Sequence, residues 1–315
     1  MIPMPCVFRL DFDVVGPVQL ANGYAYYGED DENGDDMRAG EMVVEACKAI
    51  DDEVDFSDYD WDGDGFVDQV YVLYAWHGTA TYSDDDTVWQ HEYTLEESDY
   101  GNTLEIDGVQ VNTYACSSEL GQSHVDGIGT ICHEFSHCLG FPDMYDTQYE
   151  GNFGMGSWDL MCSGSYNGGS FCPAGYTSYE RWVAGWLDPI ELTEDMSVTD
   201  MKALSDGGES YVIYNDAHPD EYYLLENRQL TGWDRELPAA GMLILHVDYD
   251  ETVWQWNIVN DIVDYSDYEG YEDCVNDHQR LTIFHADDDD DSSYWNSHYQ
   301  FYTKTTEGGA PYPYG

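Results

Sequence analysis

The stretch "HEFSHCLGFPD", residues 133–143, constrains the fold more than any other part of this chain. It places two histidines four residues apart, and residues at that spacing lie on one face of an α-helix. Two neutral imidazoles suit Zn²⁺, which in catalytic sites takes three protein ligands and a water. The stretch therefore predicts a helix that ends near Gly140 and carries His133 and His137 as zinc ligands.

Two further features of this stretch extend the prediction. Glu134 projects beside the imidazoles, where it would accept a proton from a zinc-bound water. Gly140 lets the chain reverse sharply, and Asp143 follows ten residues after His133, where a third ligand would meet the metal. The five-residue pattern alone also occurs by chance on surface helices, so the glycine and the aspartate give the prediction much of its weight.

Helical and strand patterns alternate up to about residue 188. Residues 8–20 and 66–76 are rich in β-branched residues and predict strands, the second of them central in a sheet because it is almost wholly apolar. Shorter strands are expected within residues 88–93 and 109–116. Apolar residues at helical spacing predict three helices: residues 39–51, 127–140 and 177–187, the last capped by Thr177 or Ser178.

Beyond residue 189 the pattern changes, and strands follow one another without helical patterns between them. The segments are "SYVIYN", "EYYLLENRQL", "GMLILHVDY" and "RLTIFHA". The chain is therefore expected to consist of an α/β (α+β) domain, residues 1–188, and a β-rich C-terminal region, residues 189–315.

The charge of the chain limits its partners. Hydrophobic residues at 42% and aromatic residues at 15% indicate a folded protein, yet 65 acidic residues face only 9 Lys and Arg, for a net charge of -56. Such a surface repels phosphate backbones and anionic membranes, so no nucleic-acid partner is expected. No apolar stretch approaches the ~20 residues that would span a bilayer, so no membrane insertion is expected either.

An acidic loop, "DYDWDGDGFVDQVY", predicts a calcium site. Counted from Asp60, the residues Asp60, Asp62, Asp64 and Asp68 match the first nine positions of a calcium-binding loop, with a glycine at the turn. The twelfth position is Tyr71 instead of a bidentate glutamate. The site is therefore either completed from elsewhere, by Asp58 for example, or weak, and the alternative is a plain turn before a strand.

Five separated segments together resemble the immune inhibitor A family of secreted bacterial zinc metallopeptidases. They are "GIGTICHEFSHCLGFPDMYD", "GSWDLMCSGSYNGG", "YERWVAGWL", "EYYLLENRQ" and "GMLILHVDY", which occur in the family's order across most of residues 11–290. The second segment also resembles the methionine turn of metzincins, with Met161 as an apolar floor under the metal.

The resemblance implies a zincin-type domain and an exported, calcium-containing zinc endopeptidase that acts on proteins or peptides. It implies that His133 and His137 bind zinc, that Glu134 is the general base and that Asp143 is the third ligand. Glu180 is the competing third ligand, by analogy with peptidases that take a glutamate from a later helix. Family members carry an opening strand and helix ahead of the segment "FDVVGPV", so this chain is expected to begin inside the catalytic domain.

Two other classes of function compete with the peptidase. One is an inert calcium-dependent binding protein that keeps the scaffold, against which the intact His133, Glu134 and His137 weigh. The other is a zinc hydrolase with a non-peptide substrate, which the resemblance does not support. Cysteine usage leaves a further choice open, because Cys162 and Cys172 could form a disulfide in an exported protein or remain buried thiols.

Overall fold

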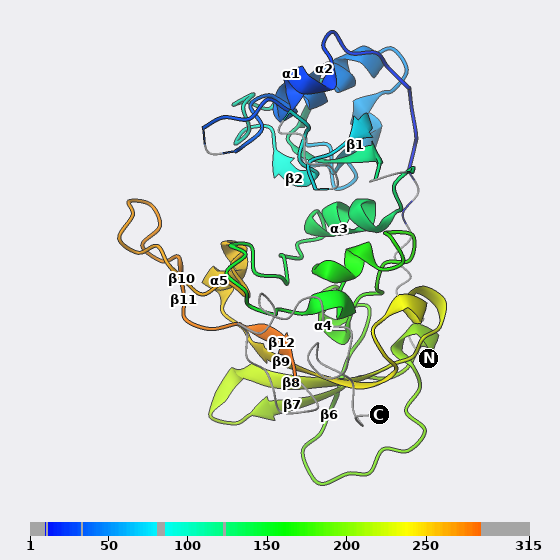
Figure 1. Ribbon diagram of the computed structural model, residues 1–315, viewed down its shortest axis with the longest axis vertical. Helices are drawn as coiled ribbons and strands as arrows, with labels where there is room; N and C mark the ends of the chain where they lie inside the picture. Colours follow the sequence, from blue (N-terminus) through cyan, green and yellow to red (C-terminus); the bar gives the residue numbers. More distant parts are fainter. Residues whose placement is uncertain (1–9, 11, 33, 81–85, 122–123, 285–315) are drawn as a thin grey trace. The chain divides into compact units, whose positions relative to one another are not determined.

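Helices and strands are mixed along the chain, which confirms the predicted mixed class of fold (Figure 1). The computed structural model describes residues 10, 12–32, 34–80, 86–121 and 124–284. Contacts divide the described residues into a first unit, up to residue 140, and a second unit, from residue 141 onward. The domains 1–188 and 189–315 stay a prediction, because a division by contacts does not define the domains of a family.

A three-stranded sheet with the strand order β1-β5-β2 forms the centre of the first unit. β1 (Val70–His77) runs parallel to β5 (Thr113–Leu120), and β2 (His91–Thr94) pairs antiparallel with the other edge of β5. Among the described residues β5 is therefore the central strand, and the prediction that β1 is central was wrong. The apolar residues of β1 are not covered on both faces, because Leu73 is 59% exposed.

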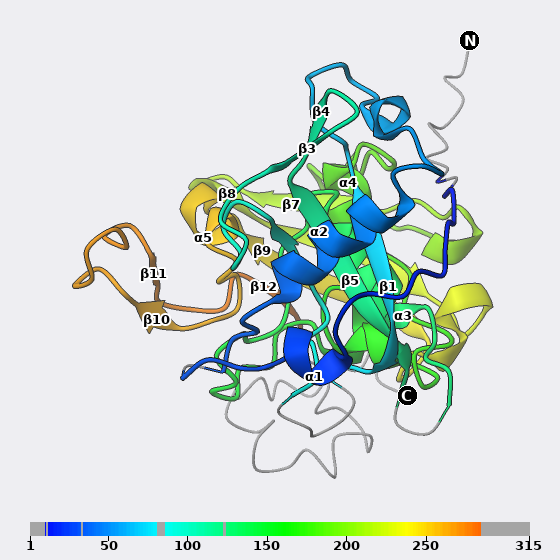
Figure 2. The same ribbon diagram turned by 90° about the horizontal axis from the view of Figure 1, so that it is seen from above.

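The helix α2 (Ala39–Ile50) covers one face of this sheet, as Figures 1 and 2 show, and confirms the predicted helix. Its buried Met42, Val43 and Cys47 join Val72 of β1 and Tyr114 of β5 in the main core of the unit. The remaining elements are α1 (Tyr24–Tyr27), the 3₁₀ turn η1 (Phe56–Tyr59) and the hairpin of β3 (Leu104–Ile106) and β4 (Val109–Val111).

The strand predicted at residues 8–20 is wrong for its described part. Residues 12–20 pair with no strand among the described residues, and Val14 is 92% exposed. Pro17 has no N–H to donate to a ladder, and Gly16 takes a backbone φ of +100°, which a residue with a side chain rarely adopts. These two residues interrupt an otherwise strand-like composition.

The helix α3 (Gly129–His137) packs against β5 and β2 on the face opposite α2 (Figure 1). Successive side chains of β1 point to opposite faces of the sheet. Val72 packs into the core with α2. Its neighbour Tyr71 lies on the side of α3, where the charge of Glu134 contributes to raising its pKa. The helix ends at His137, three residues before the predicted end, and Gly140 has a φ of +86° in the left-handed region.

The second unit contains a five-stranded sheet with the strand order β12-β9-β8-β7-β6. All pairs are antiparallel except β6 with β7, and alternate residues of β8 and β9 are buried on one face. The strands are β6 (Ile190–Glu191), β7 (Tyr211–Asn215), β8 (His218–Arg228), β9 (Gly241–Asp248) and β12 (Leu281–Ile283).

Short helices and turns connect the parts of this unit. α4 (Ser178–Val183) is capped by Thr177, whose hydroxyl accepts from the N–H of Tyr179, and this confirms one of the two predicted caps. The helix α5 (Glu251–Gln255) interrupts the predicted run of strands. The others are η2 (Gly156–Trp158), η3 (Ser163–Tyr166), η4 (Leu204–Asp206), η5 (Gly232–Glu236) and the ribbon of β10 (Val263–Asp264) and β11 (Val275–Asn276).

A buried ion cluster lies on the covered face of β8. Arg228 is fully buried, and its guanidinium pairs with Glu226 at 3.0 Å and with Asp234 at 2.7 Å. Glu226 also accepts from the N–H of Ser178 at 2.5 Å, and Asp234 accepts from the N–H of Gly175 at 3.1 Å. The cluster therefore fixes the entry into α4 as well as the sheet.

A second buried pair lies between the turn η2 and α4. The carboxyl groups of Asp159 and Glu180 are both fully buried, and the hydroxyl of Thr177 donates to Glu180. Burial raises the pKa of Asp159 well above its usual range, and the charge of Glu180 and the hydrogen bond with it raise the pKa further. Burial therefore favours the protonated form of Asp159, and its Oδ1 accepts from the N–H of Met161 at 2.6 Å.

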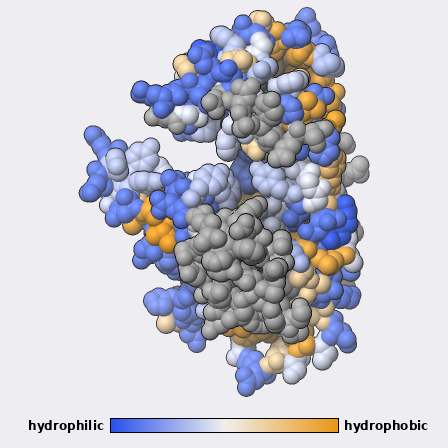
Figure 3. All heavy atoms as spheres, in the orientation of Figure 1, coloured by the Kyte–Doolittle hydropathy of each residue, from blue (hydrophilic) through white to orange (hydrophobic). Residues whose placement is uncertain are grey.

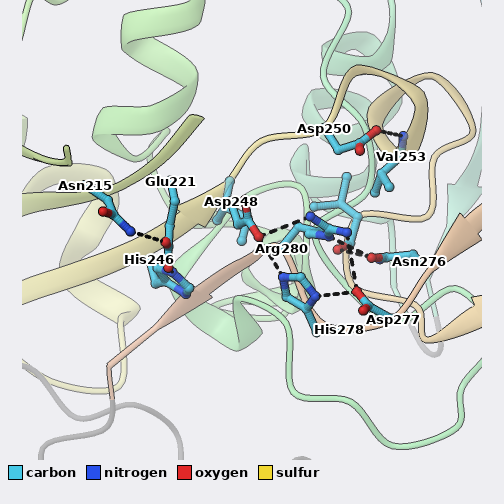
Figure 4. A network of polar contacts seen from close by, with 12 residues as sticks. Asn215, Glu221, His246, Asp248, Asp250, Val253, Asn276, Asp277, His278 and Arg280 are labelled. Atoms are coloured by element: carbon cyan, nitrogen blue, oxygen red, sulfur yellow. Dashed lines mark hydrogen bonds and ion pairs between the residues drawn. The ribbon is translucent and has the colours of Figure 1, made fainter. Parts of the chain in front are cut away.

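A third polar network, shown in Figure 4, joins β9 to the chain before β12. Arg280 pairs with Asp248 at 3.1 Å, and His278 contacts the same carboxylate oxygen at 2.9 Å. Arg280 also donates to Asn276, whose amide donates at 2.8 Å to the carbonyls of Ile258 and Asp261. The network thus holds the main chain of residues 258–261.

The surface of the described residues is mostly hydrophilic in the view of Figure 3, with smaller hydrophobic patches. Among these residues, no helix combines the length and the apolarity needed to cross a membrane. Cys162 and Cys172 are both free and buried, and the thiol of Cys172 lies 3.2 Å from the carbonyl of Trp233.

We expect Arg228→Met to lower the free energy of unfolding by about 3–5 kcal/mol, because it leaves the buried carboxylates of Glu226 and Asp234 without their cation. Urea denaturation would measure the change. Arg235→Met is the matched control, because Arg235 is exposed and lies 3.9 Å from Glu236. The control should stay within about 0.5 kcal/mol of wild type, and an equal effect of both substitutions would contradict the role of the cluster.

We expect Asp159→Asn to flatten the dependence of stability on pH. A carboxyl whose pKa is raised by folding stabilises the protein below its unfolded pKa of 3.8, and this contribution is lost as pH rises through the folded pKa. The loss amounts to at most about 1.4 kcal/mol per pH unit. Urea denaturation at a series of pH values above 4 would measure it, and a slope equal to that of wild type would contradict a raised pKa of Asp159.

An opposite control is Asp264→Asn, because a hydrogen bond from Ser266 lowers the pKa of Asp264. That carboxylate stabilises the fold above its unfolded pKa and loses the effect as pH falls. Asp264→Asn should therefore change the dependence of stability on pH in the opposite direction to Asp159→Asn.

Candidate metal centre

The helix α3 presents the two histidines side by side. The ring centroids of His133 and His137 are 4.9 Å apart with their planes at 90°. Both rings are partly exposed, whereas Glu134, between them in sequence, is buried. Spacing along one helix thus gives two nitrogen donors and one carboxylate from a single turn.

Asp143 is brought to the same place by the reversal at Gly140. One ligand atom from each of His133, His137 and Asp143 lies within 4.8 Å of the other two. Two imidazole nitrogens and one carboxylate oxygen are the donor set that zinc takes at about 2.0–2.2 Å in three-ligand sites. The chemistry and spacing of these donors fit a zinc ion.

Charged and polar groups of the sheet surround the helix. Burial raises the pKa of Glu92 on β2, the carboxylate of Glu134 raises it further and His137 lowers it. Burial also raises the pKa of Tyr71 on β1, with Glu134 adding to the effect. Glu92 and Tyr71 therefore lie close to Glu134. Strand register places them there, so no motif in the sequence could have indicated either residue.

Glu180 lies in a different environment from the three grouped residues. It is fully buried in the second unit, where it accepts from the hydroxyl of Thr177 and raises the pKa of the neighbouring Asp159. The group of possible metal ligands that contains the two histidines includes Asp143 and does not include Glu180. Of the two candidates for the third ligand, the geometry favours Asp143.

Met161 is fully buried, as expected of the methionine in the resembling turn. Its carbonyl accepts from the N–H of Met144 at 2.7 Å, so the turn lies directly beside the residue that follows Asp143. Its own N–H is held by Asp159. The turn therefore supports the chain segment that carries Asp143.

Asn257 also contacts Asp143, a contact that the sequence analysis did not predict. Its Oδ1 accepts from the N–H of Asp143 at 2.6 Å, and its Nδ2 donates to Oδ2 of Asp143 at 2.8 Å. The two residues are 114 positions apart, so no local spacing could have linked them.

The acidic loop brings together three of its four predicted ligands. Carboxylate oxygens of Asp60, Asp62 and Asp64 lie within 4.8 Å of one another, and Asp60 also accepts from three backbone N–H groups of the loop at 2.9–3.0 Å. Asp68 lies outside this group and accepts from the N–H of Trp61. Tyr71, at the twelfth position, faces α3 instead of the loop.

Comparison with known sequences identifies a family for more than half of the chain. The family described as immune inhibitor A peptidase M6, catalytic domain, matches residues 6–188. Immune inhibitor A of Bacillus thuringiensis subsp. alesti is 26% identical over 221 residues, which are 59% of this chain and 32% of that protein. Pre-pro-metalloprotease PrtV of Vibrio cholerae is 29% identical over 199 residues, which are 55% of this chain and 22% of that protein. The chain matches about a third or less of the length of these curated relatives.

Proposed function

The chain belongs to the immune inhibitor A peptidase family M6, and we propose that it is a zinc-dependent endopeptidase that hydrolyses proteins or peptides. The grouping of His133, His137 and Asp143 around one point is the observation that carries the proposal. According to this proposal, the domain is of the zincin type and α3 is its active-site helix. The relatives support it because one of them is named a metalloprotease.

His133, His137 and Asp143 would hold the zinc ion. When bound there, zinc supplies Lewis-acid chemistry, which makes water more acidic and polarises the scissile carbonyl. Glu134 then accepts a proton from the attacking water and passes it to the leaving amine. Its place between the two histidines on α3 suits this role, because the proton acceptor must lie within reach of the attacking water.

Secretion and calcium belong to the same proposal. The name of the Vibrio relative includes the prefix pre-pro, which supports an exported protein. Asp60, Asp62 and Asp64 offer oxygen ligands at a spacing that suits the 2.3–2.6 Å bonds of Ca²⁺. Calcium in this loop would stabilise the turn before β1 and take no part in the chemistry.

Replacing Glu134 by Gln should abolish peptide hydrolysis without removing the metal. A positioned general base contributes about 10²–10⁴-fold in rate, so cleavage of casein should fall by at least that factor. Zinc content, measured by elemental analysis, should remain at one ion per chain because no ligand is changed. Glu96→Gln, an exposed glutamate of the same unit, is the control and should cleave casein at the wild-type rate.

An active wild-type chain whose Glu134→Gln variant keeps its zinc and cleaves casein undiminished would refute the mechanism. Zinc binding without cleavage by the wild type would favour a non-peptide hydrolase. Absence of zinc together with a calcium-dependent stability would favour the inert binding protein. Addition of a chelator to the wild type should stop cleavage.

Calcium should raise the melting temperature of the wild type through linkage, because it binds the folded loop alone. At 100 times Kd the gain is about 2.7 kcal/mol. The double substitution Asp62→Ala and Asp64→Ala should remove the response, as measured by calorimetry. Asp51→Ala with Asp52→Ala removes the same charge from exposed positions, and this control should respond as the wild type does. A calcium response that survives in the first double variant would leave the loop as a plain turn.

A further inference from the structure

Asn257 holds Asp143 by both its main chain and its side chain. The N–H of Asp143 can only donate, so the oxygen of the Asn257 amide must face it, at 2.6 Å. The amide nitrogen therefore faces the carboxylate, at 2.8 Å from Oδ2. Two hydrogen bonds from one planar amide fix the orientation of the carboxylate relative to its own backbone.

Asn257 is itself fixed by its surroundings. Its φ of +54° lies in the left-handed region, which asparagine, aspartate and glycine adopt more readily than other residues. It follows Trp256, the C-cap of α5, whose first turn is capped by Asp250. The next residues, 258–261, are held by Asn276, which Arg280 and Asp248 support in the network of Figure 4.

Neighbours of Asn257 hold the rest of the segment that follows Asp143. The buried Asn260 donates to the carbonyl of Met144 at 2.9 Å. The buried carboxylate of Asp261 accepts from the N–H and the hydroxyl of Thr147 at 2.7 and 2.6 Å. One short segment thus anchors residues 143–147 through side chains.

The residue that contacts Asp143 is a neutral amide in a region that contains several carboxylates. Burial raises the pKa of Asp261 to about 6, and the nearby carboxylates of Asp146 and Asp143 raise it as well. A neutral donor at residue 257 meets the carboxylate of Asp143 without adding another negative charge. An aspartate there would place two carboxylate oxygens at hydrogen-bonding distance and repel.

We propose that Asn257 is a positioning residue of the metal centre, which orients the carboxylate of Asp143 for ligation. The inference rests on the proposed function, in which Asp143 is the third zinc ligand. Groups that hydrogen-bond to metal ligands typically change metal affinity by about 10–100-fold. Residue 257 lies outside the part of the chain that the family matches, residues 6–188, so this contribution comes from the C-terminal region.

The test is the substitution Asn257→Asp in the full chain. Aspartate tolerates the left-handed backbone and keeps an oxygen for the N–H of Asp143, but it replaces the donor to Oδ2 by an acceptor. Zinc affinity should fall by about 10–100-fold in competition with a chromophoric chelator. The visible spectrum of the Co²⁺-loaded protein should also change, because it reports the geometry of the ligands.

A second variant and a control separate positioning from folding. Asn257→Gly removes both hydrogen bonds without backbone strain, and it should lower zinc affinity and alter the Co²⁺ spectrum while circular dichroism shows a folded chain. Asn227→Asp makes the same chemical change at a residue that donates to the carbonyl of Met201, and both metal readouts should equal those of wild type. Wild-type affinity and an unchanged spectrum in both variants of Asn257 would overturn the proposal.

Asp143→Ala distinguishes failure of this inference from failure of the proposed function. If Asp143→Ala loses zinc while the Asn257 variants bind it as wild type does, the ligand set stands and the role of Asn257 falls. If Asp143→Ala keeps wild-type affinity and Glu180→Ala loses zinc, the third ligand is Glu180, and both the ligand role of Asp143 and the positioning role of Asn257 fall.

Discussion

The second unit depends on a positive charge that has no access to water. Arg228 lies on the covered face of β8, and its guanidinium makes five hydrogen bonds, to Glu226, Asp234 and two backbone carbonyls. A buried charge is tolerated only when it is paired and hydrogen-bonded in this way. Because the same two carboxylates also accept from the backbone at Gly175 and Ser178, the ion cluster fixes the chain between the turn of Met161 and α4.

Local pattern predicted much of the fold and the centre of the candidate site. The spacing of His133 and His137, the glycine after them and the helical pattern of residues 39–51 all depend on neighbours within a few turns, and the structure has helices at both places. Local pattern failed where the position of a segment depends on which strands pair with one another. Apolar composition could not tell the edge strand β1 from the central strand β5, and it could not show that Pro17 and Gly16 would keep residues 12–20 out of a sheet.

Acidic residues in this chain serve as backbone acceptors as well as surface charges, which composition alone cannot reveal. Asp60 satisfies three N–H groups of one loop, and Asp146 satisfies three more in the loop after Asp143. Carboxylates in such positions stabilise turns that have no regular hydrogen-bonding pattern of their own. Part of the net charge of -56 is therefore the consequence of a chain rich in irregular loops.

The contact between Asp143 and Asn257 also imposes an order in time. The two residues are 114 positions apart, and a ribosome that adds ~5–20 residues per second makes the second roughly 6–23 s after the first. Throughout that interval the nascent chain has its histidine helix and its aspartate but lacks the amide that orients the carboxylate. In the proposed peptidase, the metal centre is therefore complete only after residue 257 has been made and has packed against Asp143.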